Sequence, residues 1–195
     1  MKIKKEQLGT KAAVKATMLQ AHLAWAEKRL GGLDGLNRVI AHVDAECAKL
    51  LPRPKLATDW IAFRCLIQID RAIATAVGGS PEQVFRDMGR HSAITNLGGV
   101  YKSFIAGEPH RFFGGMSVLH SSFQNFGRTQ YEKRGSTSGA IVLDGYTEYS
   151  PVHCTTARGY FEEALRMMHA PGPITVSETA CQCAGEGRCV YEMSW

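Results

Sequence analysis

The sequence lacks any long apolar run. No stretch of about 18 apolar residues, the length that a membrane-spanning helix needs, occurs in it. The basic residues at the N-terminus are followed by polar and charged residues rather than by the apolar segment of a signal peptide. We therefore expect no membrane span, no secretion and a cytoplasmic location, where cysteine thiols are normally reduced.

Signatures of nucleic-acid, nucleotide and catalytic sites are also missing. The 195 residues carry a formal net charge of +5, yet no run of Lys and Arg with interleaved aromatic residues occurs. The sequence contains no Gly-rich phosphate loop, dinucleotide fingerprint, nucleophile elbow or His-Glu-x-x-His helix. We expect no direct binding of nucleic acid. Catalysis has weak support, and whether the protein is an enzyme stays open.

The composition is that of a folded protein with a proper core, because 45% of the residues are apolar and 21% are charged. Apolar spacing and capping residues predict helices over residues 6–30, 34–50, 59–77, 80–105, 109–125 and 151–169. Strand patterns cover 128–134, 140–149, 174–183 and 188–195.

This order predicts an α+β fold with a helical N-terminal half. Two hairpins would form a four-stranded antiparallel sheet, with helix 151–169 between them in sequence and packed on the sheet. We expect residues 1–55 to form a helical arm or dimerisation region, and residues 56–195 to form a domain that binds a small molecule.

The densest group of metal-ligand residues lies near the C-terminus. Glu178, Cys181 and Cys189 surround a Gly-rich turn, and Cys154 lies upstream. Thiolates gathered around such a turn suggest a tetrahedral metal site, most plausibly zinc. Glu178 and Cys181 would face opposite sides of a regular strand, so the chain must bulge or turn between them if both are ligands.

These residues carry a resemblance to a known family. Glu-x-x-Cys-x-x-x-Gly-x-x-x-Cys, preceded by Cys-x-x-x-x-Gly-Tyr, resembles the 4-vinyl reductase domain, a module that also forms the sensor of bacterial phenol- and xylene-responsive activators. The resemblance implies a structural zinc at Cys154, Glu178, Cys181 and Cys189. The wider superfamily includes haem–nitric-oxide-binding domains and Golgi-transport subunits.

Alternatives for the cysteines stay open. Cys183 could replace Glu178 and complete a four-cysteine site, because Cys is the stronger zinc ligand. The cluster could equally consist of buried cysteines without a metal, since free Cys commonly packs as a small apolar residue. Cys47 and Cys65 lie on apolar helix faces, and we interpret both as core residues.

The same resemblance implies a pocket for a small apolar ligand. We select candidate contacts within residues 108–131, which mix aromatic and polar side chains: His110, Phe113, His120, Phe123 and Tyr131. A core helix with surface histidines explains the same pattern. Tryptophan occurs at positions 25, 60 and 195 and not in this stretch, so the phenol-specific recognition of the sensors is not reproduced. Haem binding through His110 or His120 is an alternative.

Three functions fit these observations. The first is a zinc-stabilised small-molecule sensor that acts through a homodimer or a downstream protein partner, because no output domain follows Trp195. The second is an enzyme or accessory factor in tetrapyrrole vinyl reduction. The third is a structural or trafficking subunit that carries an acyl chain on Cys65 or Cys47.

Overall fold

The computed structural model describes residues 5–53, 56–99, 102–105 and 108–195. It confirms the α+β fold with a mostly helical N-terminal half. The helices and strands are β1 (Ala13–Lys15), α1 (Ala16–Leu30), α2 (Leu33–Ile40), α3 (Ala45–Ala48), β2 (Trp60–Ala62), α4 (Phe63–Val77), α5 (Pro81–Gly98), η1 (Lys102–Ile105), α6 (Pro109–Gly114), α7 (Met116–Phe123), β3 (Arg128–Gly135), β4 (Ser138–Asp144), α8 (Pro151–Met167), β5 (Thr175–Ala180), η2 (Gln182–Ala184) and β6 (Cys189–Ser194).

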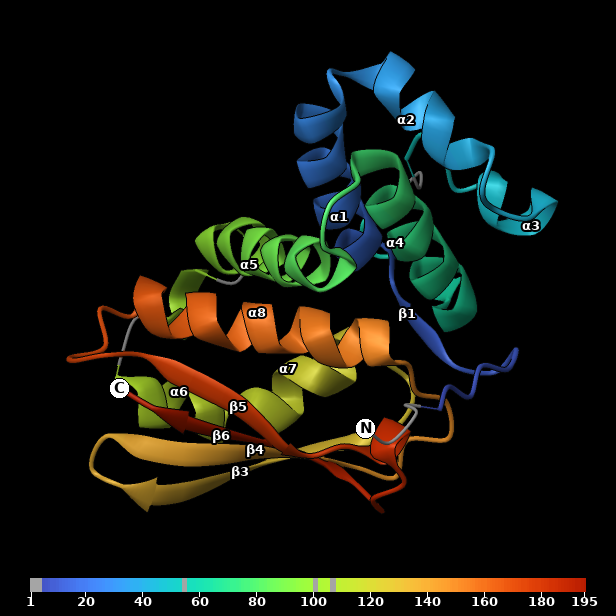
Figure 1. Cartoon of the computed structure of the whole chain (residues 1–195). Coiled ribbons are helices and arrows are strands. Elements are labelled where there is room, and N and C mark those ends of the chain that lie inside the picture. The colour runs from blue at the N-terminus through green and yellow to red at the C-terminus, as the bar shows by residue number, and fades with distance from the viewer. Residues whose placement is uncertain (1–4, 54–55, 100–101, 106–107) are drawn as a thin grey trace.

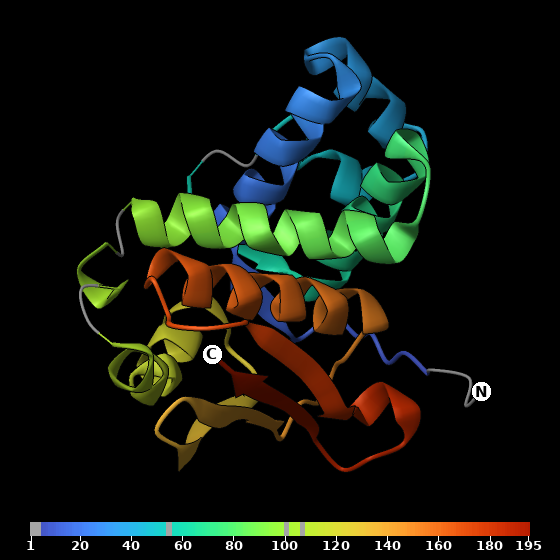
Figure 2. The same cartoon turned by 60° about the vertical axis from the view of Figure 1, so that its left-hand side comes forward.

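The elements are stacked in layers. Helix α8 runs across the four-stranded sheet, and α5 lies on α8 on the side away from the sheet (Figure 1). Helices α1, α2 and α4 gather beyond α5, as the turned view also shows (Figure 2). None of the described helices combines the length with the apolar composition that crossing a membrane requires. The cytoplasmic location stays a prediction.

The main sheet joins the two predicted hairpins. Its strand order is β3-β4-β6-β5, and all three pairings are antiparallel. The hairpins meet where β4 pairs with β6, with Ile141 opposite Tyr191 and Leu143 opposite Cys189. Both Ile141 and Tyr191 are fully buried beneath α8 and its neighbours, so this central pair anchors the core of the sheet side.

A second, two-stranded sheet was not predicted. Strand β1 pairs with β2, and Val14 lies opposite Ile61. The expected helices 6–30 and 59–77 therefore begin later, at Ala16 and Phe63. The helical spacing was correct for the later parts of both segments, but the pairing of β1 with β2 withdraws their first residues from the helices.

Several other helix boundaries differ from the prediction. The expected helix 34–50 is divided into α2 and α3, and the expected helix 109–125 into α6 and α7. Helix α5 ends at Gly98, and the part of its predicted extension at residues 100–101 lies outside the described residues. Its start is as predicted, because the Ser80 hydroxyl accepts a hydrogen bond from the Gln83 backbone N–H at 3.4 Å.

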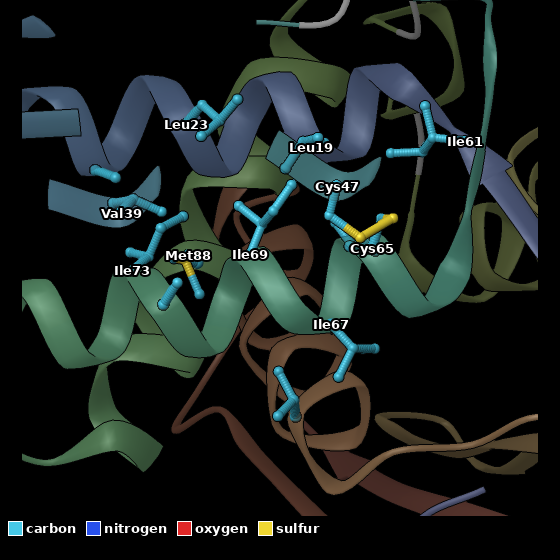
Figure 3. Close-up of a cluster of buried hydrophobic side chains, with 14 of the residues drawn as sticks. Leu19, Leu23, Val39, Cys47, Ile61, Cys65, Ile67, Ile69, Ile73 and Met88 are labelled. Carbon is cyan, nitrogen blue, oxygen red and sulfur yellow. A yellow bond between two sulfur atoms is a disulfide. The ribbon is translucent and has the colours of Figure 1, made fainter. Parts of the chain in front are cut away.

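Two apolar cores flank α5. The first unites α1, α2 and α4, and Leu19, Leu23 and Ile73 are completely buried in it (Figure 3). The second lies between the sheet, α7 and α8. Because α1 and α4 share one core, residues on both sides of the predicted domain boundary at 55/56 pack together. The boundary and the role of residues 1–55 in dimerisation stay predictions.

The first core contains a disulfide bond. Cys47 and Cys65 are both buried, as predicted for core residues, but their sulfur atoms are bonded at 2.05 Å and tie α3 to α4 (Figure 3). The interpretation of these cysteines as core residues did not include the bond between them. The remaining four cysteines are free thiols.

Candidate functional site

The C-terminal hairpin and the first turn of α8 bring the predicted metal ligands together. Cys154 comes from α8, Glu178 from β5, Cys181 from the residue after β5, and Cys189 from the start of β6. The pairing of β5 with β6 shifts register between Glu178 and Ala180, which is the irregularity that the spacing required. Gly185 at φ 92° then turns the chain back toward β6.

One potential ligand atom from each of these four residues lies within 4.8 Å of the others. The Sγ atom of Cys154 lies 3.9 Å from the Sγ atoms of both Cys181 and Cys183. Cys183 is therefore adjacent to the cluster, but the compact four-atom group contains Glu178 and not Cys183. This geometry favours the first of the two predicted ligand sets.

The thiols of this cluster influence one another's pKa. Hydrogen bonding with Cys181 raises the pKa of Cys154, and hydrogen bonding with Cys154, Cys183 and Cys189 lowers the pKa of Cys181. The backbone N–H of Gln182 donates to the Cys189 sulfur at 3.2 Å. Thiolates are the ligands that soft metal ions prefer, so the cluster has the chemistry of a site for such an ion.

A separate cavity of about 110 Å³ lies where α1, α5, α7 and α8 meet the sheet. Most of its wall is apolar, with Met18, Leu119 and Phe161 among the contributing residues. Three histidines also line it: His22 on α1, His120 on α7 and His153 on α8. An apolar wall with a few polar groups is typical of a small-molecule site.

His22 forms a buried pair with a residue of α4. Its Nδ1 atom lies 2.7 Å from Oδ1 of Asp70, and both side chains are 1% exposed. The other ring nitrogen, Nε2, is buried and has no hydrogen-bond partner among the described residues. The hydroxyls of Ser92 on α5 and Thr129 on β3 line the same cavity and are likewise buried without a partner among the described residues. Such unpaired buried groups are rare and mark a place where a further partner can bind.

The other two histidines are neutral at pH 7. Burial lowers the pKa of His120 and of His153 to about 4 each. Nε2 of His120 lies 2.6 Å from the Tyr146 hydroxyl, which in turn donates to Oε1 of Gln124 at 3.3 Å. Burial raises the pKa of Tyr146, so this phenol keeps its proton. The cavity therefore contains no cationic histidine on the α7 and α8 side.

The structure separates the five predicted ligand contacts into two groups. His120 and Phe123 line the cavity. His110 instead contacts the Tyr131 hydroxyl at 2.5 Å through Nδ1 and the Ser136 carbonyl at 2.8 Å through Nε2. Phe113 stacks against Tyr131 in the core. The ligand-binding roles of all five residues stay predictions.

The sequence interpretation did not select His22 and Asp70. Each sits within an apolar helix face, His22 between Leu19 and Leu23, and Asp70 between Ile69 and Ile73. A polar residue on such a face must find a partner when it is buried. That rule could have marked both residues, although the pairing of helices so far apart in sequence could not have been deduced from it.

Comparison with solved structures shows the fold. An H-NOX protein from S. oneidensis in the Fe(II)NO ligation state has a TM-score of 0.68 at 14% identity, covering 92% of this chain and 98% of that one. The Fe(II) unliganded H-NOX protein from K. algicida gives 0.69 at 9% identity, covering 92% and 95%. An oxygen-binding H-NOX domain related to soluble guanylate cyclases gives 0.66 at 14% identity, covering 92% and 94%.

These comparisons correct two predictions. The identification as a 4-vinyl reductase domain is wrong, because the similar solved structures are H-NOX domains and the family profile that matches is a different one. Zinc as the cofactor is also wrong, because the similar structures are described with Fe(II), NO or oxygen. The cysteine cluster matches the motif of that family, but a bulged hairpin beside a helix end is enough to bring such residues together.

Sequence comparison places the chain in a family. No curated protein matches it. A family profile described as "Protein of unknown function (DUF2378)" matches residues 63–195, from the start of α4 to the C-terminal residue. This match covers more than half of the sequence, and the chain therefore belongs to the DUF2378 family.

Proposed function

We propose that this protein is a small-molecule-binding sensor domain whose ligand occupies the cavity between α1, α5, α7 and α8. The observation that carries the proposal is a set of three buried polar atoms without a partner among the described residues, on side chains that line this apolar cavity: His22 Nε2, Ser92 Oγ and Thr129 Oγ1. The shared fold with H-NOX proteins, described in complexes with NO and oxygen, supports a sensor more than an enzyme. This is the small-molecule sensor expected from the sequence, but without the structural zinc.

A haem-based sensor is the second candidate. The H-NOX likeness favours it, and histidines line the cavity as potential axial ligands. The cavity does not fit a haem, however. Its volume of about 110 Å³ is below the roughly 150 Å³ of a cavity that binds benzene. None of the described residues that line it is Lys or Arg, so haem propionates would have no cationic partner there.

The position of the cavity suggests how binding would become a signal. It lies between the helical core around α1 and α4 and the core between α8 and the sheet. A ligand that binds one arrangement of these two cores more tightly than another would shift the population between them. We propose that a homodimer or a downstream protein partner reads this shift.

The cysteine cluster supports a separate proposal. Cys154, Glu178, Cys181 and Cys189 would hold a soft metal ion, because thiolate ligands select such ions and the four ligand atoms already lie close together. A site of this kind would fasten the C-terminal hairpin to α8. No catalytic step is assigned to it.

Two titrations test the sensor proposal. Nuclear magnetic resonance would follow benzene binding to the purified protein, and visible absorption would follow added haem. The cavity-filling variant Ala157→Leu should abolish benzene binding, whereas Ala41→Leu on the exposed end of α2 should not. Benzene binding that Ala157→Leu leaves intact would refute the site. Stoichiometric haem binding that Ala157→Leu blocks would favour the haem-based candidate.

A further inference from the structure

The buried pair of His22 and Asp70 defines one hydrogen-bonding edge of the cavity. The Asp70 carboxylate lies 2.7 Å from Nδ1, and a carboxylate in this position accepts the Nδ1 proton and fixes the ring tautomer. In the neutral imidazole, the second nitrogen, Nε2, then keeps its lone pair and is a hydrogen-bond acceptor. His22 lines the cavity, whereas Asp70, on α4, is not one of the lining residues.

Two other polar side chains of the wall already have protein partners. His120 is paired with the Tyr146 hydroxyl, and the Asn96 side-chain oxygen accepts from the Thr17 hydroxyl at 3.0 Å. The hydroxyls of Ser92 and Thr129 and the Nε2 atom of His22 remain without a partner among the described residues. A hydroxyl can rotate to donate or to accept, whereas Nε2 of a neutral ring whose proton is on Nδ1 can only accept. An unpaired buried acceptor costs free energy that a donor on a ligand would recover.

We propose, on the basis of the proposed function, that His22 Nε2 is the specificity-determining acceptor of the cavity and that the ligand is a compact, mostly apolar molecule with one N–H or O–H donor. The volume of about 110 Å³ limits this molecule to a size no larger than benzene. The rest of the ligand's surface would contact the apolar wall of the cavity. An anion is disfavoured, because no described residue at the wall is Lys or Arg.

Pyrrole and furan form a matched pair for testing this inference. Both are flat five-membered rings of nearly equal size, but pyrrole presents an N–H donor and furan presents an oxygen acceptor. Titrations followed by nuclear magnetic resonance in sealed samples would give both dissociation constants. We expect the wild-type protein to bind pyrrole about tenfold more tightly than furan, since one hydrogen bond distinguishes them.

We expect the substitution Asp70→Asn to reverse the preference for pyrrole over furan. In Asp70→Asn, the amide can donate to Nδ1, so that the ring proton moves to Nε2 and the cavity presents a donor. This variant should bind furan at least as tightly as pyrrole. The exposed control His42→Gln should behave as the wild-type protein does. Should Asp70→Asn not fold, the double variant His22→Phe/Asp70→Leu removes both polar partners together and should bind the two rings equally.

The outcomes separate the inference from the proposed function. Equal binding of pyrrole and furan by the wild-type protein, unchanged in Asp70→Asn, would overturn the role of His22 while leaving the cavity as a binding site. Failure of pyrrole, furan and benzene alike to bind would overturn both. A pyrrole preference that persists in the double variant would also overturn the inference, because the donor would then be recognised elsewhere.

Discussion

Gly89 of α5 lies directly against the carbonyl oxygen of Thr156 on α8. A Cβ atom at position 89 would come within 2.0 Å of that oxygen, and one at Gly159 within 2.1 Å of the Arg86 carbonyl oxygen. The two helices therefore touch through their backbones. This close crossing sets the spacing of α5 and α8, and both helices contribute to the cavity wall.

Gly89→Ala should destabilise the protein by about 3 kcal/mol, because the added methyl group forces two packed backbones apart. The midpoint of chemical denaturation would measure the loss. Gly98→Ala on the same helix is the matched control, since its nearest contact would be the Met167 methyl group at 3.9 Å. It should be neutral or up to about 1 kcal/mol more stable. Equal losses in both variants would contradict the close crossing.

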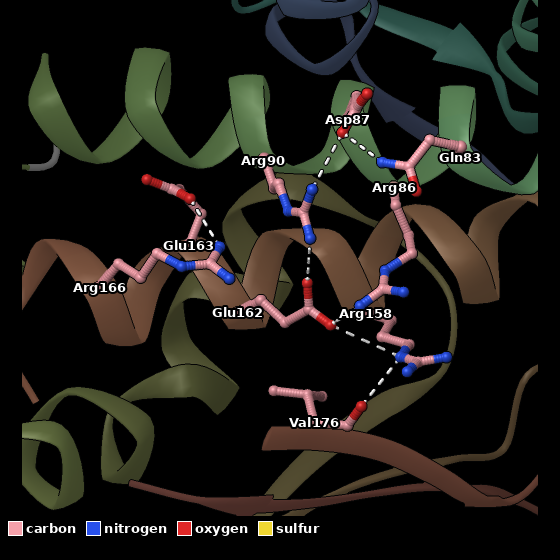
Figure 4. A network of polar contacts seen from close by, with 9 residues as sticks. All are labelled: Gln83, Arg86, Asp87, Arg90, Arg158, Glu162, Glu163, Arg166 and Val176. Atoms are coloured by element: carbon pink, nitrogen blue, oxygen red, sulfur yellow. Dashed lines mark hydrogen bonds and ion pairs between the residues drawn. The ribbon is translucent and has the colours of Figure 1, made fainter. Parts of the chain in front are cut away.

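Glu162→Gln should destabilise the protein by about 3 kcal/mol, because it removes the negative charge that three guanidinium groups share. Glu162 is 4% exposed and pairs with Arg86 and with Arg90, and Nε of Arg158 lies 3.6 Å from its Oε1 atom (Figure 4). Thermal and chemical unfolding would both report the change.

Glu163→Gln on the same helix provides the control for that measurement. Glu163 forms a more exposed ion pair with Arg166 at 3.0 Å (Figure 4). Exposed pairs of this kind contribute at most about 1 kcal/mol. A Glu162→Gln variant as stable as Glu163→Gln would show that the buried carboxylate does not hold α5 to α8.

Stability should fall as the pH is lowered from 6.5 to 4. Burial lowers the pKa of His120 from 6.5 to about 4, so in this window the unfolded chain binds a proton that the folded protein excludes. The contribution is complete above pH 6.5 and is lost toward pH 4. With allowance for partial exposure, it amounts to roughly 2 kcal/mol.

His120→Gln tests this origin of the acid sensitivity, because an amide can still contact Tyr146 but does not titrate. The slope of unfolding free energy against pH should become shallower between pH 6.5 and 4. It should not vanish, because burial lowers the pKa of His153 into the same window. If the slope of unfolding free energy against pH did not change, other groups would be the cause of the acid sensitivity.

Cys189→Ser should remove most of any metal that the purified protein retains and should loosen the C-terminal hairpin, because binding free energy at such a site is also folding free energy. Elemental analysis by mass spectrometry, together with thermal unfolding, would measure both effects. Cys183→Ser is the control, since Cys183 lies outside the four-atom group. Equal metal content in the two variants would contradict the proposed ligand set.

Local signals in the sequence predicted most of the fold. Ser80-Pro81 and Ser150-Pro151 begin α5 and α8 as their capping patterns indicate. The hairpins follow alternating patterns within short segments. The β1–β2 pair was missed because Val14 and Ile61 meet across 47 positions, and no local pattern records that partnership.

Local sequence signals predicted one candidate site well and the other only in part. The cysteine cluster was found because three of its ligands lie within one hairpin of the sequence, at spacings that geometry can test. The cavity was found only in part. His110 has the chemistry of a ligand contact, but Tyr131 and Ser136 occupy both of its nitrogens. His22 and Asp70 form a pair only because α1 packs against α4, and no local pattern in the sequence predicts that packing.

His153 and Cys154 are consecutive residues in the first turn of α8, yet one lines the cavity and the other belongs to the cysteine cluster. A rigid helical turn cannot move one side chain without carrying its neighbour along. Two ligands that each favour a different position of this turn would therefore oppose each other's binding, and two that favour the same position would assist it. Thermodynamic linkage makes that influence equal in both directions, so metal retention measured with and without pyrrole would reveal whether the two sites communicate.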